Sequence, residues 1–336
     1  MTQDRILMAH GSGGLMSQRL IDEVFKQAWQ NEIMEPMLDG AILQMPAGRL
    51  AMSTDSFVIT PLFFPGGDIG KLSICGTVND LLACGATPLY LSTAFIIEEG
   101  LPIAELRLIA ESMAKTAREV GVKLVTGDTK VVEKGSCDGV FINTTGIGII
   151  PEGIDYRPPR IQPGDKVIVT GYVGDHGLAI LAQREGLTFS TPVVSDCAAL
   201  YQLEEMVAKY GDAIKCMRDP TRGGLATVLN EIAVQAGIGI RVKEAAIPVA
   251  PAVKGACDML GMDPLYMANE GKMVMFVAAA AARDLLFDLH QLSPTANAAI
   301  IGQVDAGPSG LVLIETELGA ERILGILEGE HVPRIC

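Results

Sequence analysis

A proline-rich segment in the middle of the chain constrains the fold more than any other feature of the sequence. The stretch "PEGIDYRPPRIQPGD" spans residues 151–165 and contains four prolines. Proline has no N–H to donate and its ring clashes with a preceding helical turn, so the stretch disfavours both a helix and a central strand. We therefore expect a boundary here between two domains, residues 1–155 and 156–328. A chain of 336 residues is long enough to bury a core in each.

The first half reads as strands and helices in alternation. Apolar residues recur at helical spacing in residues 67–86 and 101–121, and each stretch ends at a glycine that suits a helix exit. Residues 41–60 predict two short strands around a Pro-Ala-Gly turn, and 122–128 and 139–150 predict two further strands. Helices packed on a sheet follow from this order.

The second half shows the same kinds of helix and strand pattern, but less regularly. Its pattern predicts a strand at 165–173, helices near 176–185 and 223–236, strands at 272–278 and 311–315, and a late helix at 320–327. The fold class that we expect is therefore α+β, with two domains of mixed sheet and packed helices.

Composition excludes several classes of protein. The formal net charge is −14, and no run of Lys or Arg offers nucleic-acid phosphates a basic patch. The seven cysteines include no CxxC pair, which disfavours a structural zinc site, and their odd number without a signal peptide predicts reduced thiols in the cytoplasm. The apolar stretch "VMFVAAAAA" is too short to span a membrane, so we expect a soluble protein.

Five aspartates are candidates for a metal site. Each lies beside small residues at an expected strand end or helix start, and Mg²⁺ is held by one or two carboxylates together with water and phosphate oxygens. Capping of a helix or turn is the alternative for each aspartate alone. The five are Asp39, Asp55, Asp80, Asp128 and Asp219.

Two further residues are candidates for proton transfer or phosphate contact. Lys130 follows Asp128 by two residues in "GDTKVV", which on a strand places both side chains on one face. Such a lysine contacts a phosphate or, with a lowered pKa, accepts a proton; a surface ion pair is the alternative. Glu270 in "ANEGKMVMF" precedes a buried-looking strand, and there the alternative is an ordinary turn residue.

Two glycine-rich segments suggest anion binding with different strength. In "DPTRGGLA", Arg222 precedes Gly223 and Gly224 at the expected start of a helix, where free N–H groups attract anions. "HGSGG" near the N-terminus lacks the Gly-Lys-Ser/Thr ending of a phosphate-binding loop, so a flexible turn is the better interpretation.

The sequence ends on a cysteine. Residues 329–336, which include Pro333, are expected to form a mobile tail outside the core, able to carry Cys336 to a distant site. A harmless leftover thiol is the alternative.

Taken together, these motifs resemble one family. "HGSGG", "STDSFV", "FPGGDIGKLSICGTVNDLLACGA", "GDTKVV", "DPTRGGLA", "NEGK" and "PRIC" occur in the order found in the HypE family of hydrogenase maturation proteins, which are carbamoyl dehydratases. The likeness covers essentially the whole chain. HypE is similar in turn to aminoimidazole ribonucleotide synthetase, selenophosphate synthetase and thiamine-monophosphate kinase.

The resemblance implies an assembly and a reaction. The N-terminal domains would pair into a barrel-like sheet in a homodimer that binds ATP and Mg²⁺. A carbamoyltransferase would load a carbamoyl group onto Cys336, and ATP-dependent dehydration would convert it to a thiocyanate. The cyano group would pass to an iron-bearing scaffold of two further maturation proteins, as a ligand for the iron of a nickel–iron hydrogenase.

The resemblance also implies roles for individual residues. Cys336 carries the substrate, with Lys130 and Glu270 as candidate bases, and the five aspartates hold the metal ions. The implied nucleotide-binding residues are Asp55, Asn79, Asp80, Asp128, Thr129, Lys130, Arg222 and Gly223.

Two rival functions remain open on the sequence. A selenophosphate synthetase or a small-molecule kinase of the same superfamily would act on a free substrate; the former calls for a reactive Cys or Sec near the N-terminus, and residues 1–20 contain neither. A non-catalytic scaffold would use the tail only for docking and would leave the acidic motifs without a role.

Overall fold

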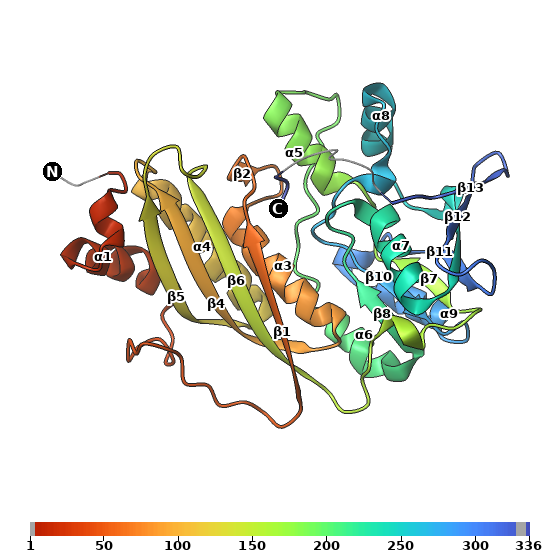
Figure 1. Cartoon of the computed structure of the whole chain (residues 1–336), viewed down its shortest axis with the longest axis horizontal. Coiled ribbons are helices and arrows are strands. Elements are labelled where there is room, and N and C mark those ends of the chain that lie inside the picture. The colour runs from red at the N-terminus through yellow and green to blue at the C-terminus, as the bar shows by residue number, and fades with distance from the viewer. Residues whose placement is uncertain (1–3, 327–333) are drawn as a thin grey trace.

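The chain folds into two halves that lie side by side, each built on a β-sheet (Figure 1). The structure is a computed structural model that describes residues 4–326 and 334–336. In Figure 1 the C-terminal residues lie between the two halves, near β2 and α5. Among the described residues, no helix is long and apolar enough to cross a membrane.

The N-terminal half contains a four-stranded sheet in the order β1-β6-β4-β5. Its strands are β1 (Arg49–Phe57), β6 (Val140–Ile150), β4 (Thr87–Glu98) and β5 (Lys123–Val132). The strands expected at 122–128 and 139–150 are confirmed as β5 and β6. The strand expected before Pro46 is wrong: residues 41–46 form no strand, and β1 pairs only with β6.

Two long helices cover one face of this sheet, and both were expected. The helix α3 (Ile69–Ala83) begins at Asp68, whose side chain accepts hydrogen bonds from two backbone N–H groups, and α4 is Ile103–Val120. The helix α4 buries one face, whereas α3 is buried almost all round because it lies between the sheet and the second half.

The N-terminal segment packs against the edge strand β5. It comprises η1 (Met8–Gly11), α1 (Leu15–Leu20), the π-helical turn η2 (Ile21–Lys26) and α2 (Gln27–Trp29). The rings of Phe25 and Trp29 lie 4.8 and 5.8 Å from that of Phe95. A Cβ on Gly11 would stand 2.6 Å from the Val131 nitrogen, so "HGSGG" begins in a close-packed turn rather than a flexible one.

The C-terminal half contains a seven-stranded mixed sheet in the order β13-β12-β9-β11-β7-β10-β8. The strands are β7 (Lys166–Val169), β8 (Ile214–Arg218), β9 (Gly239–Lys243), β10 (Val274–Val277), β11 (Ala299–Asp305), β12 (Val312–Glu315) and β13 (Glu321–Ile323). The helices are α5 (Asp175–Glu185), α6 (Leu203–Tyr210), α7 (Gly224–Ala236), α8 (Pro251–Leu260) and α9 (Ala282–Leu289). A small hairpin of β2 (Phe63–Phe64) and β3 (Gly67–Asp68) belongs to the N-terminal half.

Most expected elements of this half are present, including α5, α7, β7, β10 and β12. The late helix at 320–327 is wrong, because Glu321–Ile323 forms β13 and pairs with β12. A turn in which the Thr316 N–H donates to the Ala320 carbonyl reverses the chain directly after β12. Pairing with the strand just completed outweighs the helical spacing of a few apolar residues. The α+β class with two domains of mixed sheet is confirmed.

One hydrophobic core joins the two halves. It includes residues of α3, such as Leu72 and Val78, together with Met217 of β8 and Met275 of β10. Ile335, from the C-terminal segment, is buried in the same core. A site formed between the halves is therefore held by elements of both.

Candidate active site

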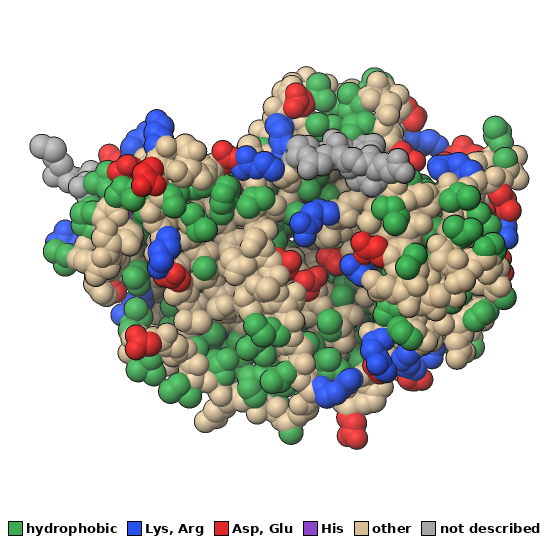
Figure 2. All heavy atoms as spheres, viewed as in Figure 1, with side chains coloured by type: hydrophobic (Ala, Val, Ile, Leu, Met, Phe, Trp, Pro, Cys, Tyr) green, Lys and Arg blue, Asp and Glu red, His purple; other side chains and the backbone are tan. Residues whose placement is uncertain are grey.

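Three of the five predicted metal ligands converge between the halves. Asp55 lies on β1, Asp80 in the last turn of α3, and Asp219 directly after β8. Burial, together with the charge of Asp80, raises the pKa of both Asp55 and Asp219 to about 7. Figure 2 shows acidic side chains gathered in a hollow near the middle of the face viewed. Three like charges therefore crowd one site.

Local contacts orient these carboxylates. Asp80 accepts a hydrogen bond from the Ser53 hydroxyl on the facing strand, two residues before Asp55 on the same side of β1. The exposed Arg222 partly offsets the raised pKa of Asp55 through its positive charge. Gly223 and Gly224 have φ values of 73° and 63°, and a Cβ on Gly224 would meet the Met267 oxygen at 2.5 Å. Glycine thus allows the backbone of this turn to approach its neighbours.

Glu270 is the buried carboxyl of the site. Its side chain is 3 % exposed, and its Oε1 has no hydrogen-bond partner in the part of the chain that the structure describes. Burial raises the pKa of Glu270 well above its usual range, and the charge of Asp219 raises it further. Burial thus favours the protonated form of Glu270, and its Oε1 is free to accept a hydrogen bond.

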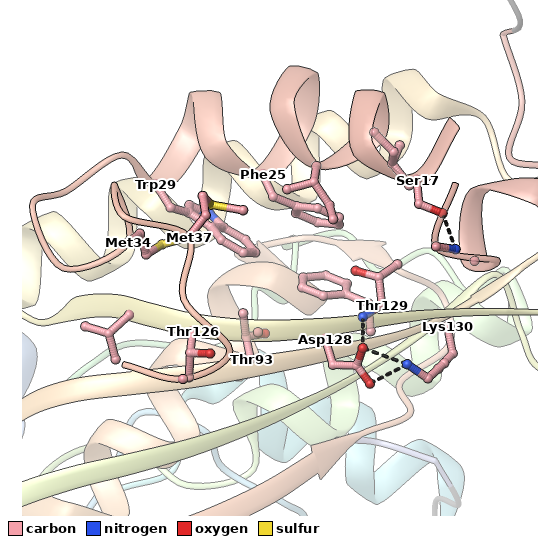
Figure 3. A pocket seen from close by; sticks show the side chains of 18 of the residues that line it. Ser17, Phe25, Trp29, Met34, Met37, Thr93, Thr126, Asp128, Thr129 and Lys130 are labelled. Carbon is pink, nitrogen blue, oxygen red and sulfur yellow. Dashed lines mark hydrogen bonds and ion pairs between the residues drawn. The ribbon is translucent and has the colours of Figure 1, made fainter. Parts of the chain in front are cut away.

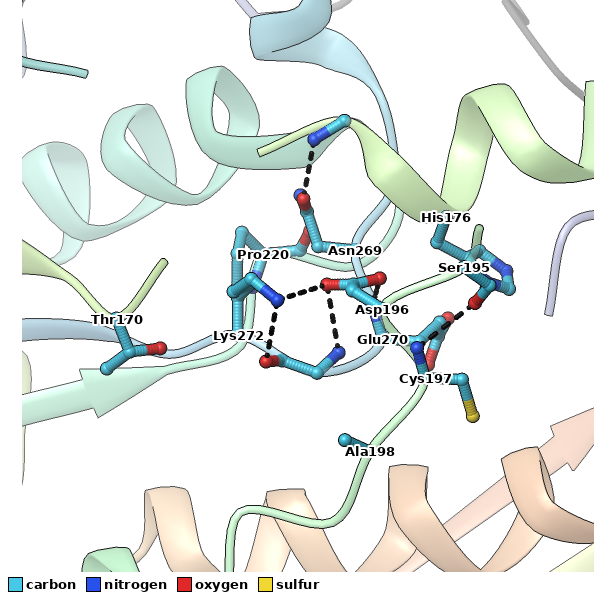
Figure 4. A network of polar contacts seen from close by, with 12 residues as sticks. Thr170, His176, Ser195, Asp196, Cys197, Ala198, Pro220, Asn269, Glu270 and Lys272 are labelled. Carbon is cyan, nitrogen blue, oxygen red and sulfur yellow. Dashed lines mark hydrogen bonds and ion pairs between the residues drawn. The ribbon is translucent and has the colours of Figure 1, made fainter. Parts of the chain in front are cut away.

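A polar network fixes the turn that carries Glu270 (Figure 4). The Glu270 and Gly271 N–H groups donate to the two carboxylate oxygens of Asp196, at 3.1 and 3.2 Å. Lys272 pairs with Asp196 at 3.1 Å, and both side chains are at most 10 % exposed. Burial opposes ionisation of Asp196, but nearby positive charge, above all that of Lys272, and hydrogen bonds together outweigh it and lower the pKa of Asp196. A charged pair therefore holds the backbone on both sides of the Glu270 carbonyl.

Asn79 and Asn269 join this turn to the rest of the site. Asn79 donates to the Ala198 carbonyl at 3.0 Å and the Glu270 carbonyl at 3.3 Å, and accepts from the Leu200 N–H. Asn269 donates to the Pro220 carbonyl, next to Asp219, at 2.9 Å. The amide of Asn79 is thus engaged with backbone, so its contact in this structure positions Glu270.

Cys336 lies half-buried at this site. Its backbone oxygen accepts a hydrogen bond from the Val58 N–H at 3.0 Å, and its side chain packs against the shared core. Burial raises the pKa of the Cys336 thiol to about 12, and the charge of nearby Glu270 adds to the effect. Asp55 and Asp219 contribute in the same direction. Of the expected mobile tail 329–336, residues 329–333 lie outside the described residues, and 334–336 are docked here.

Asp128 and Lys130 lie apart from this cluster. They form an exposed ion pair at 2.7 Å, with side chains 62 % and 63 % exposed. In the register of the sheet, Asp128 is in line with Ala94, Asn143 and Ser56, one row beyond the row of Asp55. Adjacent rows point to opposite faces, so Asp128 and Lys130 project from the face away from α3, called here the open face. Within one chain they cannot share a centre with Asp55.

A cavity of about 290 Å³ lies beside this pair, at the edge of β5 (Figure 3). Thr129 lines it from the side of Phe25 and Trp29, whereas Asp128 points to the other side of the strand. His10, Gly11 and Gly13 of "HGSGG" also line it. Asp39 is exposed in the segment between α2 and β1, with Gly40 at the cavity. The fifth metal candidate is thus also outside the cluster.

The donor set suits a hard cation shared with phosphate oxygens better than a fully protein-bound metal. Among the residues described, no group of three or more His, Cys, Asp or Glu is close enough to enclose an ion. Yet the charge of Asp80 raises the pKa of Asp55 and of Asp219, and a divalent cation would relieve that repulsion. Mg²⁺ commonly takes one or two carboxylates and fills its other positions with water and phosphate. The residues fit such a group.

Several residues that shape the site escaped the sequence analysis. Asp196 and Lys272 form the buried pair, and His176, bonded to Ser195, contacts the C-terminal segment. Asp196 and Ser195 lie in a loop without helical or strand pattern, so only their neighbours in space reveal them. Lys272 directly follows "NEG", and a lysine at the start of an apolar strand was a usable signal.

The chain matches known families over most of its length. The family model described as AIR synthase related protein, N-terminal domain, matches residues 38–150, and its C-terminal counterpart matches 162–315. A protein named carbamoyl dehydratase HypE from Rhizobium leguminosarum bv. viciae is 50% identical over 99% of this chain and 95% of its own. The Escherichia coli protein of that name is 46% identical over 99% of this chain and 100% of its own.

The chain belongs to the HypE family. The resemblance of its motifs is thereby confirmed, and HypE proteins are named for the carbamoyl dehydratase activity. A crystal structure described as the hydrogenase maturation protein HypE in complex with ATP superimposes with a TM-score of 0.95 at 48% identity, covering 98% of this chain and 99% of the other. The HypE of a HypE–HypF complex gives 0.81 at 49% identity, covering 92% and 99%. A thiamine-monophosphate kinase of Stenotrophomonas maltophilia, 18% identical with a TM-score of 0.67, shares the fold alone.

Proposed function

We propose that this chain uses ATP to dehydrate a carbamoyl group carried on the sulfur of Cys336, which makes a thiocyanate. The observation that supports this most is that Glu270 lies near Cys336. A buried carboxyl oxygen without a partner lies near the sulfur that would carry the N–H groups of the substrate. The HypE relatives, named carbamoyl dehydratases, give the reaction class.

The chemistry requires activation of an amide oxygen, which is a poor leaving group. The carbonyl oxygen of S–C(=O)–NH₂ bonds to the γ-phosphorus of ATP while the bond to the ADP oxygen breaks. The two N–H protons are lost, and the carbon–oxygen bond breaks to release phosphate and leave S–C≡N. The oxygen thus leaves with phosphate, and the products balance those of a dehydration coupled to hydrolysis of ATP.

Glu270 is the candidate for the base, and the buried network defines its task. Burial raises its pKa, which favours the protonated form. To accept an N–H proton it must first ionise, and a cation that neutralises Asp219 and Asp55 would remove two of the charges that keep it protonated. Proton transfer is therefore coupled to filling of the carboxylate cluster.

Asp55, Asp80 and Asp219 are the residues that would hold Mg²⁺. When bound, that ion would neutralise charge on the transferred phosphate. Arg222, whose positive charge influences both Asp55 and Cys336, is suited to contact a phosphate oxygen, and Gly223 leaves room for it at the start of α7. Asp80 is held in place for this task by Ser53.

Roles for Asp128, Thr129 and Lys130 call for a second copy of the chain. The open face carries Leu50 and Met52, which are 61% and 71% exposed, and Ile96 at 44%. Such an apolar sheet face is unfavourable in water, and pairing two of them would close a barrel-like structure. Lys130 and Asp128 project from the same face, so in such a homodimer they would lie at the interface, and we propose that they act there on the nucleotide bound by the partner.

The wider partners follow from the relatives. HypE is described in a complex with HypF, which supports a carbamoyltransferase of that type as the enzyme that loads Cys336. We further propose that an iron-bearing scaffold of two maturation proteins accepts the cyano group for a nickel–iron hydrogenase. All seven cysteines are free thiols, as a cytoplasmic site of action would require.

The function is tested by the mass of the peptide that contains Cys336. Protein first carbamoylated by its transferase should lose one water from this peptide, for each ATP consumed, after Mg·ATP is added. Cys336→Ala should give no such product, whereas the control Cys84→Ala, which removes an exposed thiol, should react normally. A cyanated product formed by the Cys336→Ala protein would refute the proposal.

A further inference from the structure

The C-terminal segment is held by side chains that the dehydration itself does not use. The backbone oxygen of Ile335 accepts a hydrogen bond from Nε2 of His176 at 2.8 Å, and the Arg334 oxygen accepts one from Arg184 at 2.8 Å. Arg334 has a φ of 54°, an uncommon conformation for a residue with a side chain. The segment therefore adopts one particular docked shape that its neighbours enforce.

His176 has a fully determined set of partners. Its side chain is 0 % exposed, at the start of α5, and its Nδ1 lies 2.7 Å from Oγ of Ser195. A carbonyl oxygen can only accept, so Nε2 must carry the hydrogen. In the neutral imidazole Nδ1 is then the acceptor, and the Ser195 hydroxyl donates to it. Burial lowers the pKa of His176, which favours this neutral form.

Ser195 is itself held on both sides. Its Oγ accepts a hydrogen bond from the Cys197 N–H at 3.0 Å, and its own N–H donates to the Pro65 carbonyl at 2.8 Å. The next residue, Asp196, holds the N–H groups of Glu270 and Gly271. Figure 4 shows His176 and Ser195 beside this turn. Two adjacent residues, Ser195 and Asp196, thus bond to His176, which holds the C-terminal segment, and to the turn that carries Glu270.

We infer that His176, oriented by Ser195, is a positioning residue that latches the C-terminal segment so that the Cys336 sulfur faces Glu270. The inference rests on the proposed function only for its catalytic consequence. The latch acts one residue before Cys336, so it fixes the backbone without occupying the space of a group carried on sulfur. It acts by hydrogen bonding to backbone and touches no reacting atom.

The latch has opposite effects on two processes. Dehydration needs the docked segment, whereas reagents and a loading enzyme need Cys336 to leave its half-buried position. Removing one hydrogen bond to a buried carbonyl should raise the undocked population about tenfold. A general loss of stability is told apart from loss of the latch by a control substitution away from the site and by a variant that keeps the N–H donor.

The first test measures docking without any catalysis. The rate of alkylation of Cys336 by iodoacetamide is followed from the mass of its peptide in the full-length protein. In His176→Leu the rate should rise about tenfold, while His176→Gln, which retains an N–H donor, should stay near the wild-type rate. The matched control is His290→Leu, since Nε2 of His290 also bonds a backbone carbonyl, that of Ala298, away from the site. Ser195→Ala should give a smaller rise.

The second test measures the chemistry. Carbamoylated His176→Leu should dehydrate more slowly in a single turnover with Mg·ATP, and His176→Gln should restore most of the rate. If the wild type fails to dehydrate, the proposed function falls while the alkylation result still decides the latch. The latch is overturned if Cys336 reacts at the wild-type rate in a folded His176→Leu protein. If that variant does not fold, an unchanged rate in Ser195→Ala overturns it.

Discussion

Two sets of charged residues on one sheet behave differently. Asp55, together with Asp80 and Asp219, lies on the side of α3, where burial and mutual repulsion raise the pKa of Asp55 and Asp219 to about 7. Asp128 lies one row away on the open face, where its hydrogen bond to Lys130 lowers its pKa and water surrounds both groups. The face of the sheet on which an aspartate lies therefore decides whether its surroundings raise or lower its pKa.

The buried side of the sheet holds a nearly complete candidate centre, whereas the open face holds only part of one. On the buried side, the negative charges of neighbouring carboxylates raise the pKa of Glu270 and of the Cys336 thiol. A bound cation and substrate would reduce this repulsion. On the open face, an exposed ion pair contributes little stability, and its carboxylate lies one row away from that of Asp55. A second chain is the simplest way to make the exposed pair part of a centre.

The largest effect is expected from removing the acid–base group of the buried side. Glu270→Gln keeps the shape but cannot accept a proton, so dehydration of carbamoylated protein should slow about a hundredfold to ten-thousandfold. Binding of ATP, measured by calorimetry, should change little. The control is Glu204→Gln on α6, where burial also raises the pKa of a glutamate. Product formed by Glu270→Gln at the wild-type rate would remove Glu270 from the mechanism.

An intermediate effect is expected when the open face is tested in mixed dimers. Chains with Lys130→Ala and chains with Glu270→Gln are purified together by different tags, and each homodimer should be inactive. If Lys130 serves the partner's centre, the mixed dimer regains one intact centre of two, hence about half of the activity.

The position of the product sharpens this test. The cyanated Cys336 should appear only on the Lys130→Ala chain, because that chain keeps Glu270 beside its own Cys336. An inactive mixed dimer would mean that Lys130 acts within its own chain, against the arrangement of the two faces.

The smallest effect is a pH dependence of stability. In the fold Asp55 ionises near a pKa of about 7, compared with 3.8 for an unperturbed aspartate, so between those values the native protein binds more protons than the unfolded chain. Its contribution to stability is present at low pH and is lost as the pH rises through about 7. The melting temperature of Asp55→Asn relative to wild type should therefore increase with pH, whereas Asp128→Asn should show no such increase.

Mg²⁺ should change this pH dependence of the melting temperature. Because the ion binds ionised carboxylates, added Mg²⁺ should raise the melting temperature of the wild type more at about pH 8 than at about pH 6. In Asp55→Asn the difference should shrink. Equal stabilisation by Mg²⁺ at both pH values, in both proteins, would contradict a metal role for this cluster.

The sequence predicted elements with strong local signals and missed those that depend on distant partners. The helices α3 and α4 have helical spacing and a glycine exit, and both are present. The strand β13 and the strandless segment before Pro46 were misjudged, because pairing at a sheet edge depends on which strand is adjacent. The long strand β4 had no separate prediction, although it pairs with both β5 and β6.

The residues of the candidate site likewise divide into those with a local sequence signal and those that depend on distant partners. Spacing within "GDTKVV" correctly predicted that Asp128 and Lys130 share a face, and the structure adds that they form an exposed ion pair. Grouping these two with Asp55 was a step that single motifs could not justify, since the register of four strands decides it. His176 and Asp196 left no motif because their partners are 159 and 74 residues away.

By itself, the sequence determined the chemistry available: the acidic motifs, Glu270, Cys336 and the family to which the chain belongs. Local spacing and residue type carry that information because they act over a few neighbouring residues. Only the tertiary structure decided which of these groups meet, which are buried, and which residues hold them. Burial and charge interaction depend on distances in space, and strand register and the packing of two halves around α3 set those distances.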